Sequence, residues 1–129
     1  MTENEIAKII VNAAYTIHFK LGPGLLESSY AACLNYELLK AGLRVSSQVN
    51  LPLIYDSVYL DCGYRIDLMV EDLVIIEIKS VQELKNIHHA QTITYLKLSG
   101  CKLALLINFN VSQIKYGIKR IINGYLDEE

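Results

Sequence analysis

The stretch that decides the fold is Val74-Ile75-Ile76-Glu77-Ile78-Lys79, in which two charged residues interrupt a branched aliphatic run. Branched side chains favour β-strands, and successive side chains of a strand point to opposite faces. Val74, Ile76 and Ile78 then face one way, whereas Glu77 and Lys79 face the other. Charged groups are seldom buried without partners. The stretch therefore predicts a buried strand with functional charged residues on one face.

Asp67 lies ten positions before Glu77, on the polar face of a predicted strand that covers about residues 58–69. In that strand regular alternation puts Ile66 and Leu68 on one face and Asp67 on the other. A two-residue hairpin loop would place Asp67 and Glu77 on opposite faces, because a one-residue slip inverts every side chain. A shared site thus requires a three-residue loop or a bulge near Glu71-Asp72.

Two converging carboxylates repel each other unless a cation joins them, and oxygen ligands suit Mg²⁺ or Mn²⁺. Such an ion can polarise a phosphodiester and activate a water molecule. Lys79 would point the same way and stabilise the developing negative charge. The alternative is a charge pair at a partly exposed strand end. We expect Asp67, Glu77 and Lys79 to form a metal-dependent phosphodiesterase site.

Three further residues are candidates on which spacing alone leaves two interpretations open. Glu27 is either an inward metal ligand early in a helix or a first-turn acid favoured by the helix dipole. Gln91 and Tyr95 share a helix face. They can hydrogen-bond a substrate phosphate or a metal-bound water, although a core Tyr beside a Gln is commoner. His88 and His89 indicate a solvated helix start.

Periodicity predicts the other elements. Helices are expected over about 4–19, 25–41 and 87–98, and further strands over about 45–53, 73–79 and 103–107. The tail from 111 to 124 fits either a helix or a short helix and a strand separated at Tyr116-Gly117. This α-α-β-β-β-α-β order predicts a mixed α/β domain with a small sheet flanked by helices.

The 129 residues suit one domain, and the mean hydropathy of +0.26 suggests an apolar surface for self-association. A net charge of −2 counts against tight DNA binding through phosphates alone. The few candidates for phosphate contact are Lys20, Arg65, Lys85 and Lys97. Three cysteines without metal-ligand spacing read as reduced, mostly buried thiols, and no apolar run reaches membrane-spanning length. We therefore expect a cytoplasmic protein without membrane segments.

Gly24-Leu25-Leu26-Glu27-Ser28-Ser29-Tyr30 resembles the motif that names the GxxExxY family, part of the PD-(D/E)XK nuclease superfamily. Further matches in order are Leu21-Gly22-Pro23, Arg65-Ile66-Asp67, Glu77-Ile78-Lys79, Gln91 to Tyr95 and Ile107-Asn108-Phe109. The resemblance covers nearly the whole chain, residues 1–129, as a single domain. It implies a restriction-endonuclease-like αβββαβ core with an extra N-terminal helix. Ile66 departs from the proline in the superfamily name.

The resemblance also implies site roles: Asp67, Glu77 and Lys79 as the metal-and-lysine signature, Glu27 as an extra helix-borne acid and Gln91 to Tyr95 as a QxxxY motif. Metal ligands would be Glu27, Asp67 and Glu77. We expect a Mg²⁺- or Mn²⁺-dependent nuclease that acts on DNA rather than RNA. The alternatives are a non-catalytic module that binds nucleic acid, a partner protein or a second copy of itself, and a degenerate nuclease fold.

Overall fold

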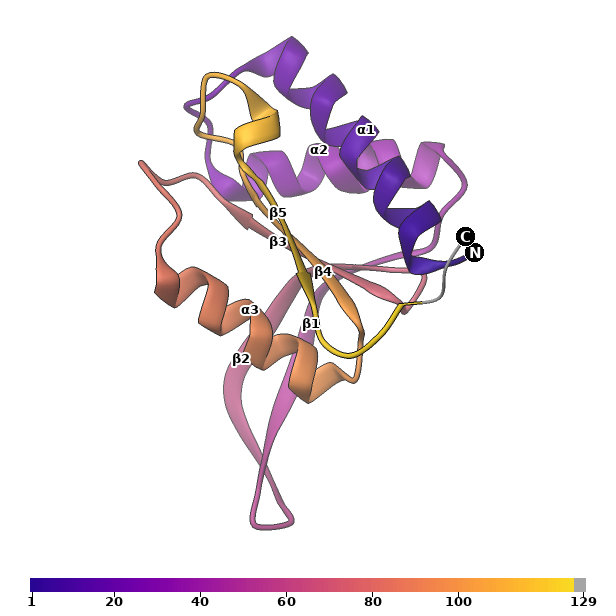
Figure 1. Ribbon diagram of the computed structural model, residues 1–129, viewed down its shortest axis with the longest axis vertical. Coiled ribbons are helices and arrows are strands. Elements are labelled where there is room, and N and C mark those ends of the chain that lie inside the picture. The colour runs from indigo at the N-terminus through magenta and orange to yellow at the C-terminus, as the bar shows by residue number, and fades with distance from the viewer. Residues whose placement is uncertain (127–129) are drawn as a thin grey trace.

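A five-stranded sheet in the order β1-β2-β3-β4-β5 forms the centre of the structure, a computed structural model that describes residues 1–126 (Figure 1). Only β3 and β4 are parallel, and α3 connects them; all other neighbours are antiparallel. The elements are α1 (Glu3–Leu21), α2 (Glu27–Lys40), β1 (Val45–Tyr55), β2 (Val58–Val70), β3 (Val74–Lys79), α3 (Asn86–Ser99), β4 (Leu103–Asn108), η1 (Ile114–Tyr116) and β5 (Ile118–Ile122). This mixed sheet with an additional N-terminal helix confirms the predicted fold.

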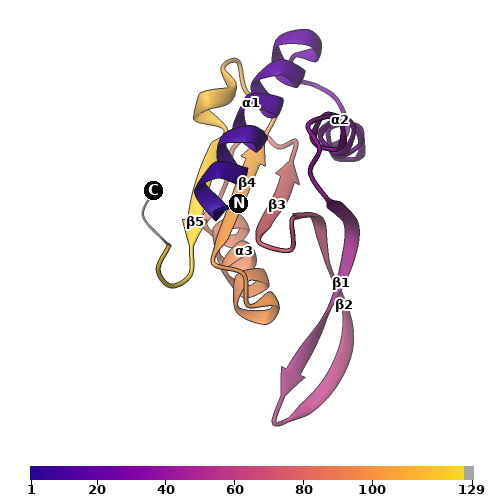
Figure 2. The same ribbon diagram turned by 90° about the vertical axis from the view of Figure 1, so that its right-hand side faces the viewer.

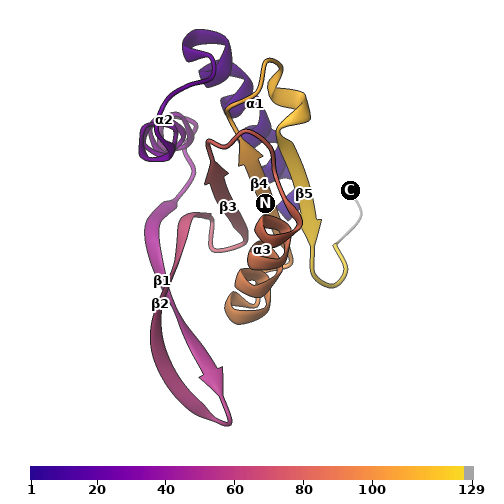
Figure 3. The same cartoon turned by 90° about the vertical axis from the view of Figure 1, so that its left-hand side faces the viewer.

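Helices cover both faces of the sheet, with α1 and α2 on one side and α3 on the other (Figures 2 and 3). Ile76 and Ile78 pack in the core beneath α1 and α2, whereas Ile75 packs in the core beneath α3. Because both faces of β3 and β4 are covered, these strands are apolar almost throughout. Each fully buried Ile or Leu contributes about 1.5–3 kcal/mol. Glu77 is therefore a costly exception in β3.

The tail forms the second of its two predicted alternatives, a short 3-10 helix followed by a strand. Gly117 separates η1 from β5, and its carbonyl oxygen accepts a hydrogen bond from the Asn108 N–H at 2.8 Å. A Cβ at position 117 would lie 2.0 Å from the Asn108 carbonyl oxygen, so only glycine fits. This close approach pairs β5 with β4 and completes the sheet.

The predicted alternation of faces along β2 is wrong at one point. Leu68 packs beneath α1 and α2, but Ile66 packs in the core beneath α3. The irregularity is in the neighbouring strand, where Gln48 has a φ of 51° and the β1–β2 ladder omits the pair that it would form with Asp67. A left-handed residue within a strand distorts the regular pleat locally. Asp67 therefore lies where the hairpin of β1 and β2 turns away from the sheet.

Beyond this point β1 and β2 form a two-stranded arm that projects from the body of the domain (Figures 2 and 3). Asp56 and Ser57 close it with positive φ angles of 52° and 65°, as a tight hairpin turn requires. Tyr55 and Tyr59 at its tip are 70% and 73% exposed. The arm is thus an apolar ribbon without helical cover at its tip.

The cysteines are all free, and their expected burial is only partly right. Cys101 is buried and Cys33 is half-buried, but Cys62 is exposed on the arm. Within residues 1–126, no helix combines the length and apolarity needed to cross a bilayer.

Candidate active site

Asp67 and Glu77 lie opposite each other where β2 and β3 separate. The β2–β3 ladder pairs Val70 with Val74 and ends at Leu68 and Ile76, so the loop has the three residues that a shared face requires. Beyond the ladder the two acids replace its hydrogen bonds. The Asp67 N–H donates to Glu77 Oε1 at 3.0 Å, and the Ile78 N–H donates to Asp67 Oδ2 at 2.8 Å. Each carboxylate is thus held by the backbone of the opposite strand.

Burial makes both acids hard to ionise. Glu77 is only 4% exposed. Burial raises the pKa of the Glu77 carboxyl to about 8, and the nearby charge of Asp67 adds to the rise. Burial also raises the pKa of Asp67, although the Ile78 N–H and the positive charge of Lys79 act in the opposite direction. The site accumulates negative charge that the protein compensates only in part, and such perturbed acids often mark functional sites.

Lys79 ends β3 two residues after Glu77, on the same face of the strand. It is partly buried, and its charge lowers the pKa of both Asp67 and Glu77. Lys79 thus lies near enough to act on both acids, and the catalytic role of the three residues stays a prediction. A cation beside two carboxylates can also neutralise charge on a bound phosphate.

Glu27 approaches the same end of β3 but does not contact the other two acids directly. It is the first residue of α2 and is exposed. Its Oε2 accepts a hydrogen bond from the Ser80 N–H at 3.3 Å, directly after Lys79. The Ser80 hydroxyl donates to the Leu25 carbonyl at 2.7 Å. The charge of Glu27 still raises the pKa of Asp67, which indicates that the carboxylates are close enough to interact.

Tyr30 supports the loop that carries Glu27, a role that the sequence analysis missed. Its hydroxyl donates to the Gly22 carbonyl at 2.6 Å and accepts from the Leu25 N–H at 3.2 Å. The ring is fully buried and stacks on Phe109 with centroids 4.3 Å apart. The sequence shows Tyr30 only as the last residue of the GxxExxY-like motif, because its contacts involve a loop that periodicity does not place.

Helix α3 closes the other side of the site with Gln91 and Tyr95. Tyr95 is 5% exposed and meets the Tyr64 ring edge-on at 6.2 Å between centroids. Burial raises the pKa of its phenol, and the charges of Glu77 and Asp67 raise it further, whereas a hydrogen bond with Gln91 lowers it. Tyr95 therefore belongs to the core and also faces the acids, while Gln91 is exposed at the helix surface.

Asn108 holds the segment that follows Lys79 in place, a role that the sequence did not reveal. It is 1% exposed and lies opposite Lys79 in the parallel pair of β3 and β4. Its Oδ1 accepts from the Val81 N–H at 3.1 Å, and its Nδ2 donates to the Val81 carbonyl at 3.0 Å. These bonds and those of Ser80 hold the segment that follows Lys79 from two sides.

The donor set fits a hard divalent cation, because Asp67 and Glu77 offer oxygen ligands and their combined charge is poorly compensated. In residues 1–126, however, no three His, Cys, Asp or Glu side chains are grouped closely enough to hold a metal ion. The structure therefore supplies two carboxylates in contact. The three-ligand set that includes Glu27 stays a prediction.

The sheet order and the carboxylate pair with its lysine define a class: restriction-endonuclease-like α/β domains. A model of the PD-(D/E)XK nuclease superfamily matches residues 4–121, and the chain belongs to that superfamily. Its nucleases generally use divalent metal ions and act on nucleic acids. Comparisons with curated proteins and with solved structures returned no match.

Proposed function

We propose that the protein is a metal-dependent nuclease that hydrolyses phosphodiester bonds, in DNA rather than RNA. The observation that carries the proposal is the reciprocal contact of Asp67 and Glu77 beside Lys79. A structural ion pair would match a buried acid with a base, but here the buried Glu77 faces a second, half-buried acid, Asp67. Family membership supports the same chemistry.

Asp67 and Glu77 would hold Mg²⁺ or Mn²⁺, which polarises the phosphodiester and activates water when bound. Glu27 is proposed as a third ligand that leaves the Ser80 N–H. Because the ion requires deprotonated ligands, its binding displaces the proton that Glu77 otherwise retains near neutral pH. Lys79 neutralises charge on the attacked phosphate.

The predicted roles of Gln91 and Tyr95 are also proposals. Tyr95 donates its phenolic proton to a substrate phosphate or bound water, and Gln91 orients Tyr95 through their hydrogen bond. The GxxExxY family assignment is supported by the contacts of Tyr30 and Glu27 around the loop. A cytoplasmic location stays a prediction.

The test is cleavage of end-labelled single- and double-stranded DNA and RNA of one sequence, with Mg²⁺, Mn²⁺ or chelator. Wild-type protein should cut DNA only with a divalent ion, and Glu77→Gln should lower the rate by at least about 10²-fold. Glu5→Gln, at an exposed position in the first turn of α1, is the matched control. Equal cleavage by wild-type protein and Glu77→Gln would mean that the activity comes from a contaminant.

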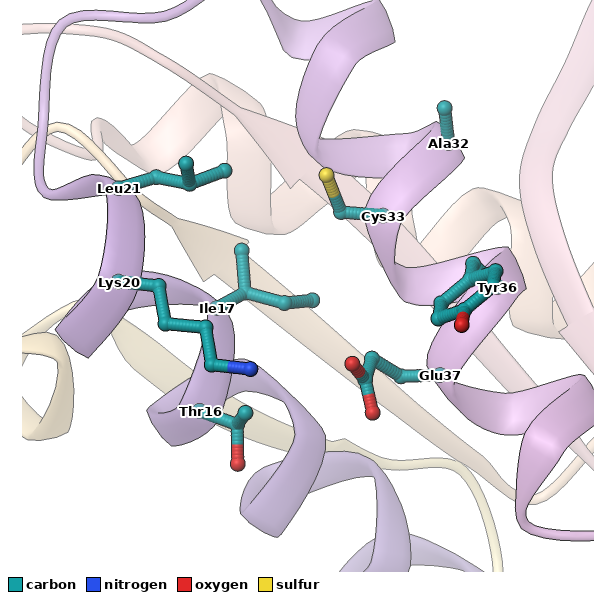
Figure 4. Close-up of a pocket in the computed structure, with 8 residues that line it drawn as sticks. All are labelled: Thr16, Ile17, Lys20, Leu21, Ala32, Cys33, Tyr36 and Glu37. Atoms are coloured by element: carbon teal, nitrogen blue, oxygen red, sulfur yellow. The ribbon is translucent and has the colours of Figure 1, made fainter.

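A second candidate is self-association through a groove of about 300 Å³ between α1 and α2 (Figure 4). Ile17 and Cys33 form its floor, and Lys20 lies in it, which argues against a role for Lys20 in phosphate contact at the acid pair. The adjacent Phe19 is 90% exposed. We propose a second copy of this chain as the occupant, because a groove next to a protruding apolar side chain provides both halves of an isologous contact.

Light scattering after size-exclusion chromatography tests this candidate. A dimer that Phe19→Asp converts to monomer supports it. Tyr125→Asp, at a residue with 91% exposure on a different segment, should leave the dimer intact. A monomeric wild-type protein at high concentration would refute it.

A further inference from the structure

A cavity of about 500 Å³ opens between the root of the β1–β2 arm and α3, directly beside the candidate active site. Tyr64 of β2 forms one wall and Lys79 another. The helix contributes Ile87, His88, Ala90 and Gln91. Because Lys79 and Gln91 line the cavity and also belong to the candidate active site, the cavity is continuous with that site.

The chemistry of this lining is that of a nucleotide pocket. Tyr64 offers an aromatic wall, held from behind by its edge contact with Tyr95. Ile87, 69% exposed, offers an apolar surface from the helix. His88 Nδ1 accepts the Lys85 N–H at 2.9 Å, so Nε2 is the ring nitrogen that can meet a ligand. Gln91 can both donate and accept hydrogen bonds. The aromatic wall suits the face of a base, the polar groups suit the hydrogen-bonding edge of the base, and the cation suits a phosphate.

We propose that this cavity binds one unpaired nucleotide of the substrate, with its base against Tyr64 and its phosphate at Lys79. The inference rests on the proposed nuclease function and narrows the substrate to single strands, frayed ends or extruded bases. A base inside an intact duplex is stacked on both sides and cannot enter a side pocket without leaving the stack.

The overall charge supports an unpaired substrate as well. Duplex binding depends mainly on phosphate neutralisation, and the chain carries 12 basic against 14 acidic residues. Stacking contributes about 1–3 kcal/mol per base and needs no excess of positive charge. We therefore expect the protein to bind single strands more tightly than duplexes.

Two smaller cavities continue from the nucleotide pocket and lead away from the arm, and together they form a path along which a strand could lie. One of about 300 Å³ shares His88 and adds Lys85. The next, of about 230 Å³, shares Glu83 with it and reaches Lys119. Lys85 and Lys119 are exposed cations at intervals along this path. They can contact phosphates of the strand that continues beyond the pocket.

The experiment measures binding of a fluorescein-labelled (dT)₁₂ strand and of a blunt hairpin duplex by anisotropy, with Ca²⁺ replacing Mg²⁺ to restrain cleavage. Ala90→Trp fills the cavity from an exposed helix position. His89→Trp adds the same bulk at the neighbouring exposed position, which does not line the cavity. Tyr64→Leu keeps an apolar side chain against Tyr95 but removes the aromatic wall. Circular dichroism checks that each variant is folded.

We expect the single strand to bind at least about tenfold more tightly than the duplex. Ala90→Trp and Tyr64→Leu should each weaken strand binding by about tenfold or more, whereas His89→Trp should match wild type. Duplex binding equal to or tighter than strand binding, or an Ala90→Trp variant that binds like wild type, would overturn the inference. Cleavage assays separate the two proposals. Cleavage without strand preference leaves the nuclease proposal standing, and strand preference without cleavage leaves only the pocket.

Discussion

Replacement of Glu77 by glutamine should make the metal-free protein more stable at alkaline pH. Glu77 is buried against Asp67, and the pKa of its carboxyl rises from 4.5 to about 8 on folding. Between these values the folded chain retains a proton that the unfolded chain releases. The stabilising contribution of the protonated acid is therefore complete below pH 4.5 and is lost as the pH rises through about 8.

The size of the effect follows from this interval. At about 1.4 kcal/mol per pH unit, a change from 4.5 to about 8 corresponds to about 5 kcal/mol. Water that enters around the ionised carboxylate lowers the cost, so we expect roughly 3 kcal/mol. Glutamine has no proton to lose, and its amide can still accept the Asp67 N–H. The stability of Glu77→Gln relative to wild type should thus increase by this amount between pH 4.5 and 8.5.

Urea unfolding followed by circular dichroism, at several pH values with chelator, measures the difference. Mn²⁺ should reverse it, because the ion stabilises the charged carboxylates of wild type but gains less from glutamine. Glu83→Gln, at an exposed position, should follow wild type throughout. Parallel stability curves for wild type and Glu77→Gln from pH 4.5 to 8.5 would refute the account of the buried acid pair.

Three other substitutions test the surroundings of the site. Tyr30→Phe removes the hydrogen bonds to Gly22 and Leu25 while keeping the ring stack. It should lower the free energy of unfolding in urea by about 1–3 kcal/mol and also lower the cleavage rate. Tyr36→Phe, at an exposed position, should change neither. Lys79→Met should lower the single-turnover cleavage rate by about 10²-fold, whereas Lys102→Met, at an exposed position before β4, should not. Asn108→Ala leaves the Val81 N–H and carbonyl without these two hydrogen bonds, so the free energy of unfolding in urea should fall by about 2–3 kcal/mol. An unchanged value would contradict the stabilising role of Asn108.

The sequence predicted the elements whose signals are local. Glu77 and Lys79 stand out in an aliphatic strand, and Gly100 ends α3 in the left-handed conformation expected of a terminal glycine. The loop of three residues after Val70 is one of the two arrangements, a three-residue loop or a bulge, that a shared face for both acids requires. These inferences worked because burial and backbone preference act over a few neighbouring positions.

Contacts between distant segments were not predictable in the same way. The break between Ile66 and Leu68 depends on the left-handed Gln48 in another strand. The bond from Ser80 to Glu27 joins residues 53 positions apart. His88 lies in the first turn of α3, as predicted, but it also accepts a hydrogen bond from the Lys85 N–H and lines a cavity formed with the arm. Tertiary geometry decides each case, and a single sequence carries no signal of it.

The exposed thiol on the projecting hairpin offers a chemical handle that needs no engineering. Cys101 is buried, which raises its thiol pKa, and Cys33 is half-buried, so an alkylating dye should react first at Cys62. Cys62 lies two residues from Tyr64 along β2. A fluorophore attached there would report in real time when a nucleic acid strand arrives, in the natural chain and without altering any residue of the acid pair.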